Sequence, residues 1–414
     1  MIPTTFSLFP FHSLTNVWGC QSVGLANTVL PAIIYAANYL IIPYPRAVVT
    51  LIELLPSIAV KLSLPFVIHR VPCRVRPLVV AICWLIAKKV ADDTPPNVLP
   101  PVRIAMSLLS SVSAAVMEVS CLGMIGHSGM HALVGWGFGT GVGLVSNAVW
   151  PFMLTHKAGK VLRSATGGVY YLVALLMFSH FVVLPQRLTK WEGGHRQERA
   201  HDDDEERRSF IEGGRHGRRP SGSGSTETRA QLLHGLVRPN MLPLFAASML
   251  LFLQQGITRT LDGSVFGTFS RFAATYGVSL HLGTLVARSS VNLFPVRNLR
   301  LSLVALVTVA VFAFFNAVFL VSIYFAFFLA FLAGLSSGSV YINVLAKVME
   351  GTRDLNDREF SLGVVTAADA GGIATGGLLS AFLEGKMMVY EVRVNEDMYN
   401  HVLLMGLNLN GSLS

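Results

Sequence analysis

The stretch QRLTKWEGGHRQERAHDDDEERRSFIEGGRHGRRPSGSGSTETRAQLLHGLVR, residues 186–238, decides how the rest of the chain is interpreted. It is long and polar, whereas almost everything on either side of it is apolar. Its acidic and basic run HDDDEERR is followed by a segment rich in Gly, Ser and Pro, and no apolar period runs along it. Because such a segment cannot bury a hydrophobic core, we expect a disordered linker between two apolar halves.

The Arg and His residues of this linker raise the alternative of a nucleic-acid interface. Its basic and acidic residues alternate, however, and no aromatic side chain other than Phe210 interleaves them. A nucleic-acid interface combines a basic patch with a recognisable binding motif. We therefore expect no nucleic acid among the partners of the protein.

The composition is that of a membrane protein. Of 414 residues, 52% are hydrophobic and 13% are charged, and the mean hydropathy is +0.55. A soluble domain carries about a quarter charged residues. The four cysteines stand singly, so neither a disulfide framework nor a zinc site is expected. They are Cys20, Cys73, Cys83 and Cys121.

Eleven stretches come close to the roughly 20 mostly apolar residues that a membrane-spanning helix needs. The weakest is 77–91, because it ends early at Lys88 and Lys89, which would have to snorkel to the interface. We expect an all-α polytopic fold of about eleven spans, six before the linker and five after it. The stretches are 18–42, 45–69, 77–91, 101–126, 131–155, 164–185, 241–261, 272–290, 300–320, 322–349 and 360–383.

Loop charges give the orientation of these spans. Lys and Arg are in excess on the side that carries Arg70, Arg74, Arg76 and the linker. Cytosolic loops carry this excess, so we expect the N-terminus and the linker to be cytosolic. An odd number of spans then places the C-terminus in the lumen.

The two halves carry weak signs of an internal repeat. GWGFGTGVGL (135–144) and ADAGGIATGGLLS (368–380) are both dense in glycine, and LSSVSAAV (109–116) is similar to LSSGSVYI (335–342). Many transporters consist of two six-helix repeats related by an axis along the membrane normal, as in the major facilitator fold. We therefore predict a six-helix bundle over 1–185, a disordered cytosolic linker over 186–238, a five-helix bundle over 239–384 and a divergent luminal tail over 385–414.

Glycines spaced four residues apart predict close helix packing. Gly135, Gly139 and Gly143 have this spacing in the fifth span, and Gly372 and Gly376 have it in the last. Small residues at this spacing let helix backbones approach each other in a membrane. The alternative of a dinucleotide-binding loop fails, because a valine stands where the third glycine of GxGxxG belongs and no strand precedes it.

Four charged residues inside predicted spans are candidates for a substrate or proton site: Glu53, Lys61, Glu118 and Asp369. A charge inside a bilayer is costly, and such residues usually face a bundle interior or a water-filled cavity. Asp369 shares a helical face with small residues, which leaves room for a ligand, water or a proton. The alternative for both Asp369 and Glu118 is a structural hydrogen bond to a neighbouring helix.

Glu53 and Lys61 lie on one stripe of the second span. They are about 12 Å apart along the axis, at a rise of about 1.5 Å per residue, so they cannot pair with each other. Each needs a partner elsewhere, or Lys61 snorkels to the interface. Pro56 and Pro65 also predict a kinked helix.

Three further positions carry polar groups whose role the sequence leaves open. Tyr341 and Asn343 in the tenth span could contact a ligand, although interhelical hydrogen bonds are an equal alternative. Arg288 ends the eighth span, where we interpret it as a cytosolic anchor. No catalytic cluster or phosphate-binding loop occurs, so we expect no enzyme, no cofactor and no metal ion.

Seven stretches resemble the battenin family of lysosomal and vacuolar membrane proteins, in wording closest to its fungal members. The resemblance implies a major-facilitator-like architecture. The last stretch and WGFGTGVGL carry it most specifically. The stretches are GLANTVLPAII (24–34), ELLPSIAVKLSLPFVIHRVP (53–72), SSVSAAVMEVSCLG (110–123), WGFGTGVGL (136–144), VARSSVNLFPVR (286–297), SIYFAFFLAFLAGLSSGSVYINVL (322–345) and DREFSLGVVTAADAGGIATGGLLSAFLE (357–384).

The resemblance implies a transporter-like protein of the vacuolar or lysosomal membrane, with a role in luminal pH homeostasis. It implies a small-molecule substrate, a basic amino acid or a glycerophosphodiester, with proton coupling. The alternative is a scaffold that acts on trafficking or on the proton pump through its cytosolic loop. Thr28 stands where the family has a second Asn, and Leu250 and Ala333 stand where it has acidic residues.

Overall fold

The computed structural model contains helices and no strand in the residues that it describes, which are 11–39, 46–68, 71–72, 75–93, 100–155, 167–184, 226–258, 269–291, 298–319, 322–352 and 354–411. Each of the eleven predicted spans overlaps a helix, so the predicted all-helical membrane fold is confirmed. Eight of the described helices are long and apolar enough to cross a membrane; α3, α7 and α11 are not among them.

The first half consists of α1 (Phe11–Tyr39), α2 (Arg46–Val67), α3 (Val75–Asp93), α4 (Pro100–Ser128), α5 (Met130–Thr155), α7 (Gly168–Phe178) and the short π-helix η3 (Ser179–Val183). The second half contains α9 (Thr226–Leu236), the π-helix η4 (Val237–Met241), α10 (Leu242–Thr258), α11 (Phe269–Ser289), α12 (Leu299–Phe319), α13 (Ile323–Gly351) and α14 (Leu355–Gly411).

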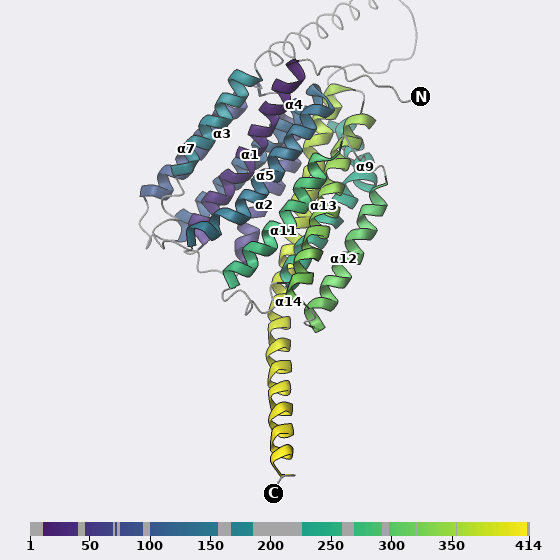
Figure 1. The fold of residues 1–414 in the computed structure, drawn as a ribbon. Helices are drawn as coiled ribbons and strands as arrows, with labels where there is room; N and C mark the ends of the chain where they lie inside the picture. Colours follow the sequence, from purple (N-terminus) through teal and green to yellow (C-terminus); the bar gives the residue numbers. More distant parts are fainter. Residues whose placement is uncertain are drawn as a thin grey trace, which may run out of the picture.

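The helices pack as two groups that meet along two seams (Figure 1). In the first half, α1 packs on α5 and α4 packs on α2 and α3. In the second half, α11 packs on α13 and α10 packs on α14. The seams are formed by α5 against α11 and by α2 and α4 against α14. Side chains that line the space between the seams therefore come from both halves of the chain.

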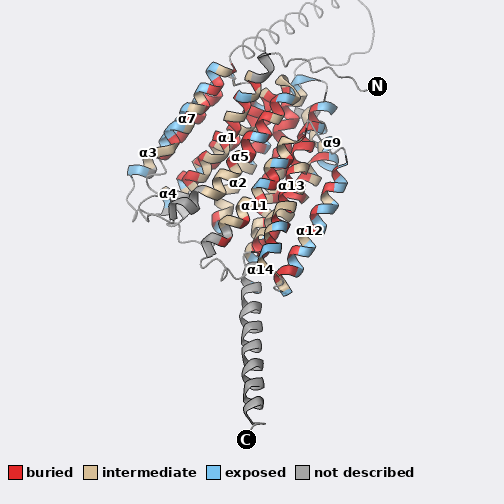
Figure 2. Cartoon of the chain, in the orientation of Figure 1, coloured by how far each residue is buried: buried red, intermediate tan, exposed pale blue. Residues whose placement is uncertain are grey.

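Burial follows this arrangement, because the buried residues face the middle of the helix group and exposed ones lie on outer helices such as α3, α7 and α12 (Figure 2). Many of the outward-facing side chains are large and apolar. A broad apolar surface of this kind is suited to contact with lipid. On α12 it is made by Leu301, Val304, Val307, Val311, Phe312, Phe314, Phe315 and Phe319.

The spaced glycines lie where neighbouring helices approach each other closely. The space beside Gly139 is filled by the backbone carbonyl of Gln21 on α1, and that beside Gly135 by the carbonyl of Val17. On α14, Gly372 and Gly376 lie in the same way against the backbone of α10. Gly143 completes the row on α5, and a Cβ added there would meet the side chain of Thr28 and the carbonyl of Leu25.

We expect Gly139→Ala to lower the free energy of unfolding by about 1–3 kcal/mol, because the added methyl group overlaps the carbonyl of Gln21 and forces α1 and α5 apart. Gly235→Ala is the matched control, since a Cβ there meets no atom of the described residues within 4 Å. Thermal unfolding of the purified protein in detergent measures both. Equal melting temperatures for the two variants would contradict this packing role.

Two predicted boundaries need correction. The linker prediction of 186–238 is wrong at its C-terminal end, where α9 and η4 are helical. Leu232 and Leu236 lie one turn apart there, and Leu236 packs against the hydrophobic core, so this segment has an apolar period. Residues 186–225 lie outside the described residues. The predicted tail 385–414 is not separate from the last span, because α14 continues as one helix to Gly411.

The lysines at the end of α3 also differ from the prediction. Lys88 is buried, pairs with Asp92 and lies over the ring of Tyr170, with 4.0 Å from its Nζ to the ring centroid. It therefore packs against α7 and does not snorkel. Lys89 is exposed and pairs with Asp93 at 3.1 Å.

Candidate functional site

A cavity of about 580 Å³ lies between the two halves of the chain. It is lined by α1, α2, α4 and α5 from the first half and by α10, α11, α13 and α14 from the second. Five of the predicted site residues line it together: Glu53, Lys61, Glu118, Tyr341 and Asp369. The fold thus brings to one place charges that are scattered along the sequence.

Lys61 on α2 and Glu118 on α4 form an ion pair within the first half of the chain. Lys61 Nζ lies 2.8 Å from a carboxylate oxygen of Glu118, and both side chains are largely buried, at 7% and 16% exposure. The hydroxyl of Tyr341 donates a longer hydrogen bond, 3.4 Å, to the other oxygen of Glu118. The interpretation of Lys61 as a snorkelling residue is therefore wrong, because its partner lies one helix away inside the bundle.

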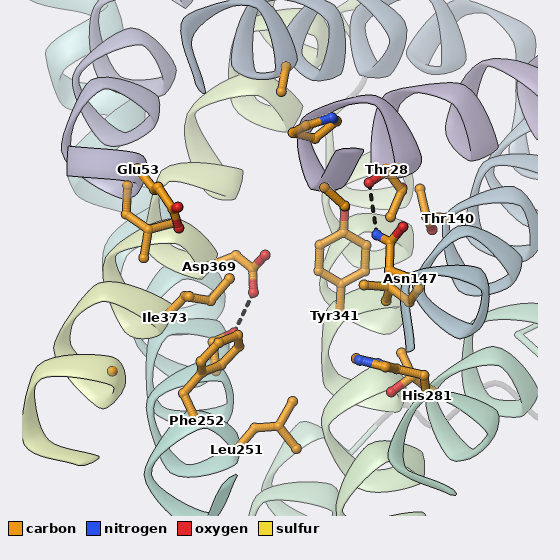
Figure 3. Close-up of a pocket in the computed structure, with 18 of the residues that line it drawn as sticks. Thr28, Glu53, Thr140, Asn147, Leu251, Phe252, His281, Tyr341, Asp369 and Ile373 are labelled. Atoms are coloured by element: carbon orange, nitrogen blue, oxygen red, sulfur yellow. Dashed lines mark hydrogen bonds between the residues drawn. The ribbon is translucent and has the colours of Figure 1, made fainter. Parts of the chain in front are cut away.

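Asp369 and Glu53, in contrast, form no ion pair. No lysine, arginine or histidine lies within ion-pair distance of either carboxylate among the residues that the structure describes. Asp369 on α14 accepts a hydrogen bond from the hydroxyl of Ser248 on α10. Both carboxylates line the cavity, and Figure 3 shows them on the same side of its open space.

Arg288 belongs to the site, although the sequence favoured an anchor at the membrane surface. It lines the cavity, donates a hydrogen bond of 3.0 Å from Nη1 to the hydroxyl of Thr140 on α5, and lies over the ring of Tyr341, 4.0 Å from its centroid. His281, Thr284 and Arg288 all line the cavity. Their i, i+3, i+7 spacing is the polar stripe that could have revealed this face of α11 in the sequence.

Asn343 does not line the cavity, so the structure does not group it with the other candidates. Its side-chain amide donates to the carbonyl of Ser339 at 2.8 Å and lies 3.3 Å from the hydroxyl of that residue. It is one turn away from Ser339 on the same helix. The polar group that α13 contributes to the cavity is Tyr341, together with Ser337.

The cavity holds three carboxylates and two cationic side chains. Lys61 and Glu118 neutralise each other, which leaves three charged side chains of the cavity without an ion pair: Glu53, Asp369 and Arg288. We call these three residues the single charges. Within the described part of the chain, none of them has an oppositely charged partner within 4.0 Å. Charged groups inside a membrane bundle are expensive unless water, a proton or a ligand compensates them, so they make the cavity the candidate binding site.

At one end of the bundle, three polar contacts link the two halves. Arg76, just after the start of α3, forms a buried ion pair of 3.0 Å with Glu359 at the start of α14. Arg358 donates to the carbonyl of Gly126 on α4 at 3.0 Å. Arg229 on α9 donates to the carbonyl of Phe66 on α2 at 2.8 Å. We call these three contacts the latch.

The cavity reaches away from the latch. Its lining includes Val49 and Thr50 near the start of α2, Gln255 and Gly256 near the end of α10, and Ser380 of α14. These positions lie toward the end of the bundle opposite Glu359, which is at the start of α14. The structure therefore combines polar contacts between the halves at one end with a cavity that extends toward the other end.

Known proteins similar to this chain include fungal relatives and one solved structure. The chain is 29% identical over 410 residues to Protein btn1 of Aspergillus fumigatus, which covers 90% of this chain and 88% of that one. It is 30% identical over 389 residues to Protein BTN1 of Yarrowia lipolytica, covering 89% and 93%. Its structure is similar to that of a D-xylose-proton symporter, with a TM-score of 0.48 and 13% identity over 92% of this chain and 95% of that one.

A family model described as CLN3 protein matches residues 19–390. The match spans both helix groups and every residue that lines the cavity. The chain therefore belongs to the CLN3 (battenin) family of membrane proteins.

Proposed function

We propose that the protein is a transporter that carries a small polar solute across the vacuolar or lysosomal membrane. The observation that carries this proposal is the cavity between the two halves with its three single charges, Glu53, Asp369 and Arg288. A structural charge would be expected to have a partner, as Lys61 and Glu118 do. The single charges can instead be compensated by a solute, water or protons.

The cycle that we propose is alternating access of the two helix groups around the cavity. The latch contains Arg76, which belongs to the group of basic loop residues that the positive-inside bias assigns to the cytosol. The described conformation would then be closed to the cytosol and open toward the lumen. Release of the latch would expose the cavity to the cytosol.

This cycle predicts that Glu359→Gln raises cytosolic access to the cavity. The substitution keeps the size of the side chain and removes its charge, so Arg76 loses its ion pair. A cysteine in place of Ala114, which lines the cavity from α4, is the reporter. We expect a membrane-impermeant maleimide on the cytosolic side to label it about tenfold faster in the Glu359→Gln background, since about 1.4 kcal/mol of lost latch energy corresponds to tenfold.

Asp93→Asn is the matched control, because it removes the exposed ion pair with Lys89 outside the latch. It should leave the labelling rate unchanged. Equal labelling rates with and without the Glu359→Gln substitution would mean that the ion pair does not hold the cytosolic side closed.

The substrate classes we propose are a basic amino acid or a glycerophosphodiester, the two that the family resemblance implies. Coupling to protons through Glu53 or Asp369 would connect transport to luminal pH. The absence of acidic residues at Leu250 and Ala333 does not weaken this proposal. Ala333 belongs to the hydrophobic core and the partly buried Leu250 packs against it. Neither lines the cavity, so the charges of the cavity do not depend on them.

An unbiased metabolite profile of isolated vacuoles, from cells with and without the protein, tests this function. We expect one class of small polar solute to change several-fold, with the change reversed by the wild-type protein and not by Asp369→Asn. An unchanged profile, or full rescue by Asp369→Asn, would contradict a transport role for the cavity.

The alternative function is a scaffold that acts through its cytosolic linker. Deletion of residues 193–222 distinguishes this scaffold from a transporter. This deletion spares α9, whose Arg229 is part of the latch. Normal vacuolar solute levels after the deletion would support transport. Loss of function with unchanged uptake activity in purified vesicles would support the scaffold.

A further inference from the structure

The two sides of the cavity carry opposite charge. Figure 3 shows Glu53 and Asp369 on one side of the open space and Tyr341, Asn147 and His281 on the other. The acidic side is built by α2 and α14. Since one oxygen of Asp369 accepts the hydrogen bond of Ser248, the carboxylate is held in place while its other oxygen has no hydrogen bond from a described residue.

Arg288 supplies the positive charge of the second side. Its hydrogen bond to Thr140 and its position over the ring of Tyr341 hold the guanidinium group on the α5, α11 and α13 side. A guanidinium has five N–H donors, and among the described residues only one donor, that to Thr140, is used. Its Nε in particular has no hydrogen-bond partner there. The remaining donors suit the two oxygens of a carboxylate or phosphodiester.

Neutral polar atoms lie between these charges. The amide of Asn147 donates to the carbonyl of Thr28 at 3.0 Å, whereas its own oxygen is buried and has no hydrogen-bond partner in the described part of the chain. His281 Nδ1 is also buried and has no hydrogen-bond partner among the described residues. Buried polar atoms of this kind normally find a partner. Both residues line the cavity, so the polar body of a bound solute can supply one.

We propose that the cavity binds a dipolar solute in one orientation, with a cationic amine at Glu53 and Asp369 and an oxyanion, carboxylate or phosphodiester, at Arg288. This inference rests on the proposed transport function and specifies its substrate chemistry. A solute with only one kind of charge leaves the opposite side of the cavity uncompensated. A solute that carries both kinds compensates Arg288 and the acidic side together.

Binding of matched probes to the purified protein in detergent tests the orientation. L-lysine carries both groups, and cadaverine is the same molecule without its carboxylate. Glycerophosphoethanolamine carries both groups, and glycerophosphoglycerol lacks the amine. The lysine pair tests a carboxylate at Arg288, and the glycerophosphodiester pair tests a phosphodiester there. The probe that binds identifies the source of the oxyanion.

We expect Arg288→Gln to weaken binding of the dipolar probe about tenfold or more, the range for a lost hydrogen bond to a charged group, and to leave cadaverine unaffected. Asp369→Asn should weaken binding of the probes that carry an amine and leave glycerophosphoglycerol unaffected. Arg288→Lys retains the positive charge and should keep part of the affinity. It also serves as the test if the Gln variant does not fold.

Two results would overturn the inference: equal weakening of lysine and cadaverine by the Arg288 variants, or no binding of either dipolar probe at millimolar concentration. Measuring uptake into proteoliposomes as well shows whether the inference about orientation fails or the transport proposal fails. If the binding pattern holds without uptake, the transport proposal fails and the binding site stands. If uptake occurs without selective dependence on Arg288, only the inference about orientation fails.

Discussion

Asp369→Asn is expected to reduce solute uptake to the background of protein-free vesicles and to abolish its dependence on a pH gradient. The substitution is isosteric, and the asparagine oxygen can still accept the hydrogen bond from Ser248. It removes the negative charge and the site for a proton. Because a charge-assisted contact inside a low-dielectric site is stronger than one in water, we expect a loss of at least about tenfold.

Ser248→Ala is the matched control for Asp369. It removes the hydrogen bond and keeps the carboxylate, so uptake should fall only moderately and remain dependent on the pH gradient. The measurement is initial uptake rate with and without an imposed gradient. Uptake by Asp369→Asn at the wild-type rate would show that this carboxylate takes no part in binding or coupling.

Lys61→Met is expected to lower the free energy of unfolding strongly, by about 3–5 kcal/mol. It removes one partner of a largely buried ion pair and leaves the Glu118 carboxylate without compensation. The melting temperature of the purified protein in detergent measures the effect. Glu118→Gln in the same background should restore much of the loss, because the double variant contains no isolated charge at this pair.

The exposed pair of Lys89 and Asp93 provides the control for this prediction. Its side chains are 73% and 64% exposed. Ion pairs in water contribute about 0–1 kcal/mol, so Lys89→Met should change the melting temperature little. Similar losses for Lys61→Met and Lys89→Met would contradict the buried pair, and so would a double variant no more stable than Lys61→Met alone.

The helices of this protein are predictable from sequence because a bilayer requires long apolar segments with internally satisfied backbones. All eleven predicted stretches overlap helices for this reason. The end of the linker was harder to predict, since α9 is short and polar on most of its surface. Of its three leucines, Leu232 and Leu236 lie one turn apart, which is a weak signal beside the charged run that precedes them.

The cavity residues were predictable only as individual charges. The free-energy cost of burying a charge in a membrane identifies Glu118 and Lys61 as unusual. Their pairing depends on how α2 and α4 meet in space, and this cannot be predicted from a single sequence. Arg288 was assigned to the membrane surface because basic residues near span ends normally lie there. Its contact with Tyr341 results from the packing of α11 on α13, and this draws its guanidinium inward.

Solute uptake by the purified wild-type protein in proteoliposomes, with and without a pH gradient, tests the central claim most directly. L-lysine and glycerophosphoethanolamine are the two labelled solutes, and Asp369→Asn is the paired variant. The cavity between the two halves predicts saturable uptake of at least one solute by the wild-type protein, lost in the variant. Uptake of neither solute above that of protein-free vesicles, under either condition, would contradict it.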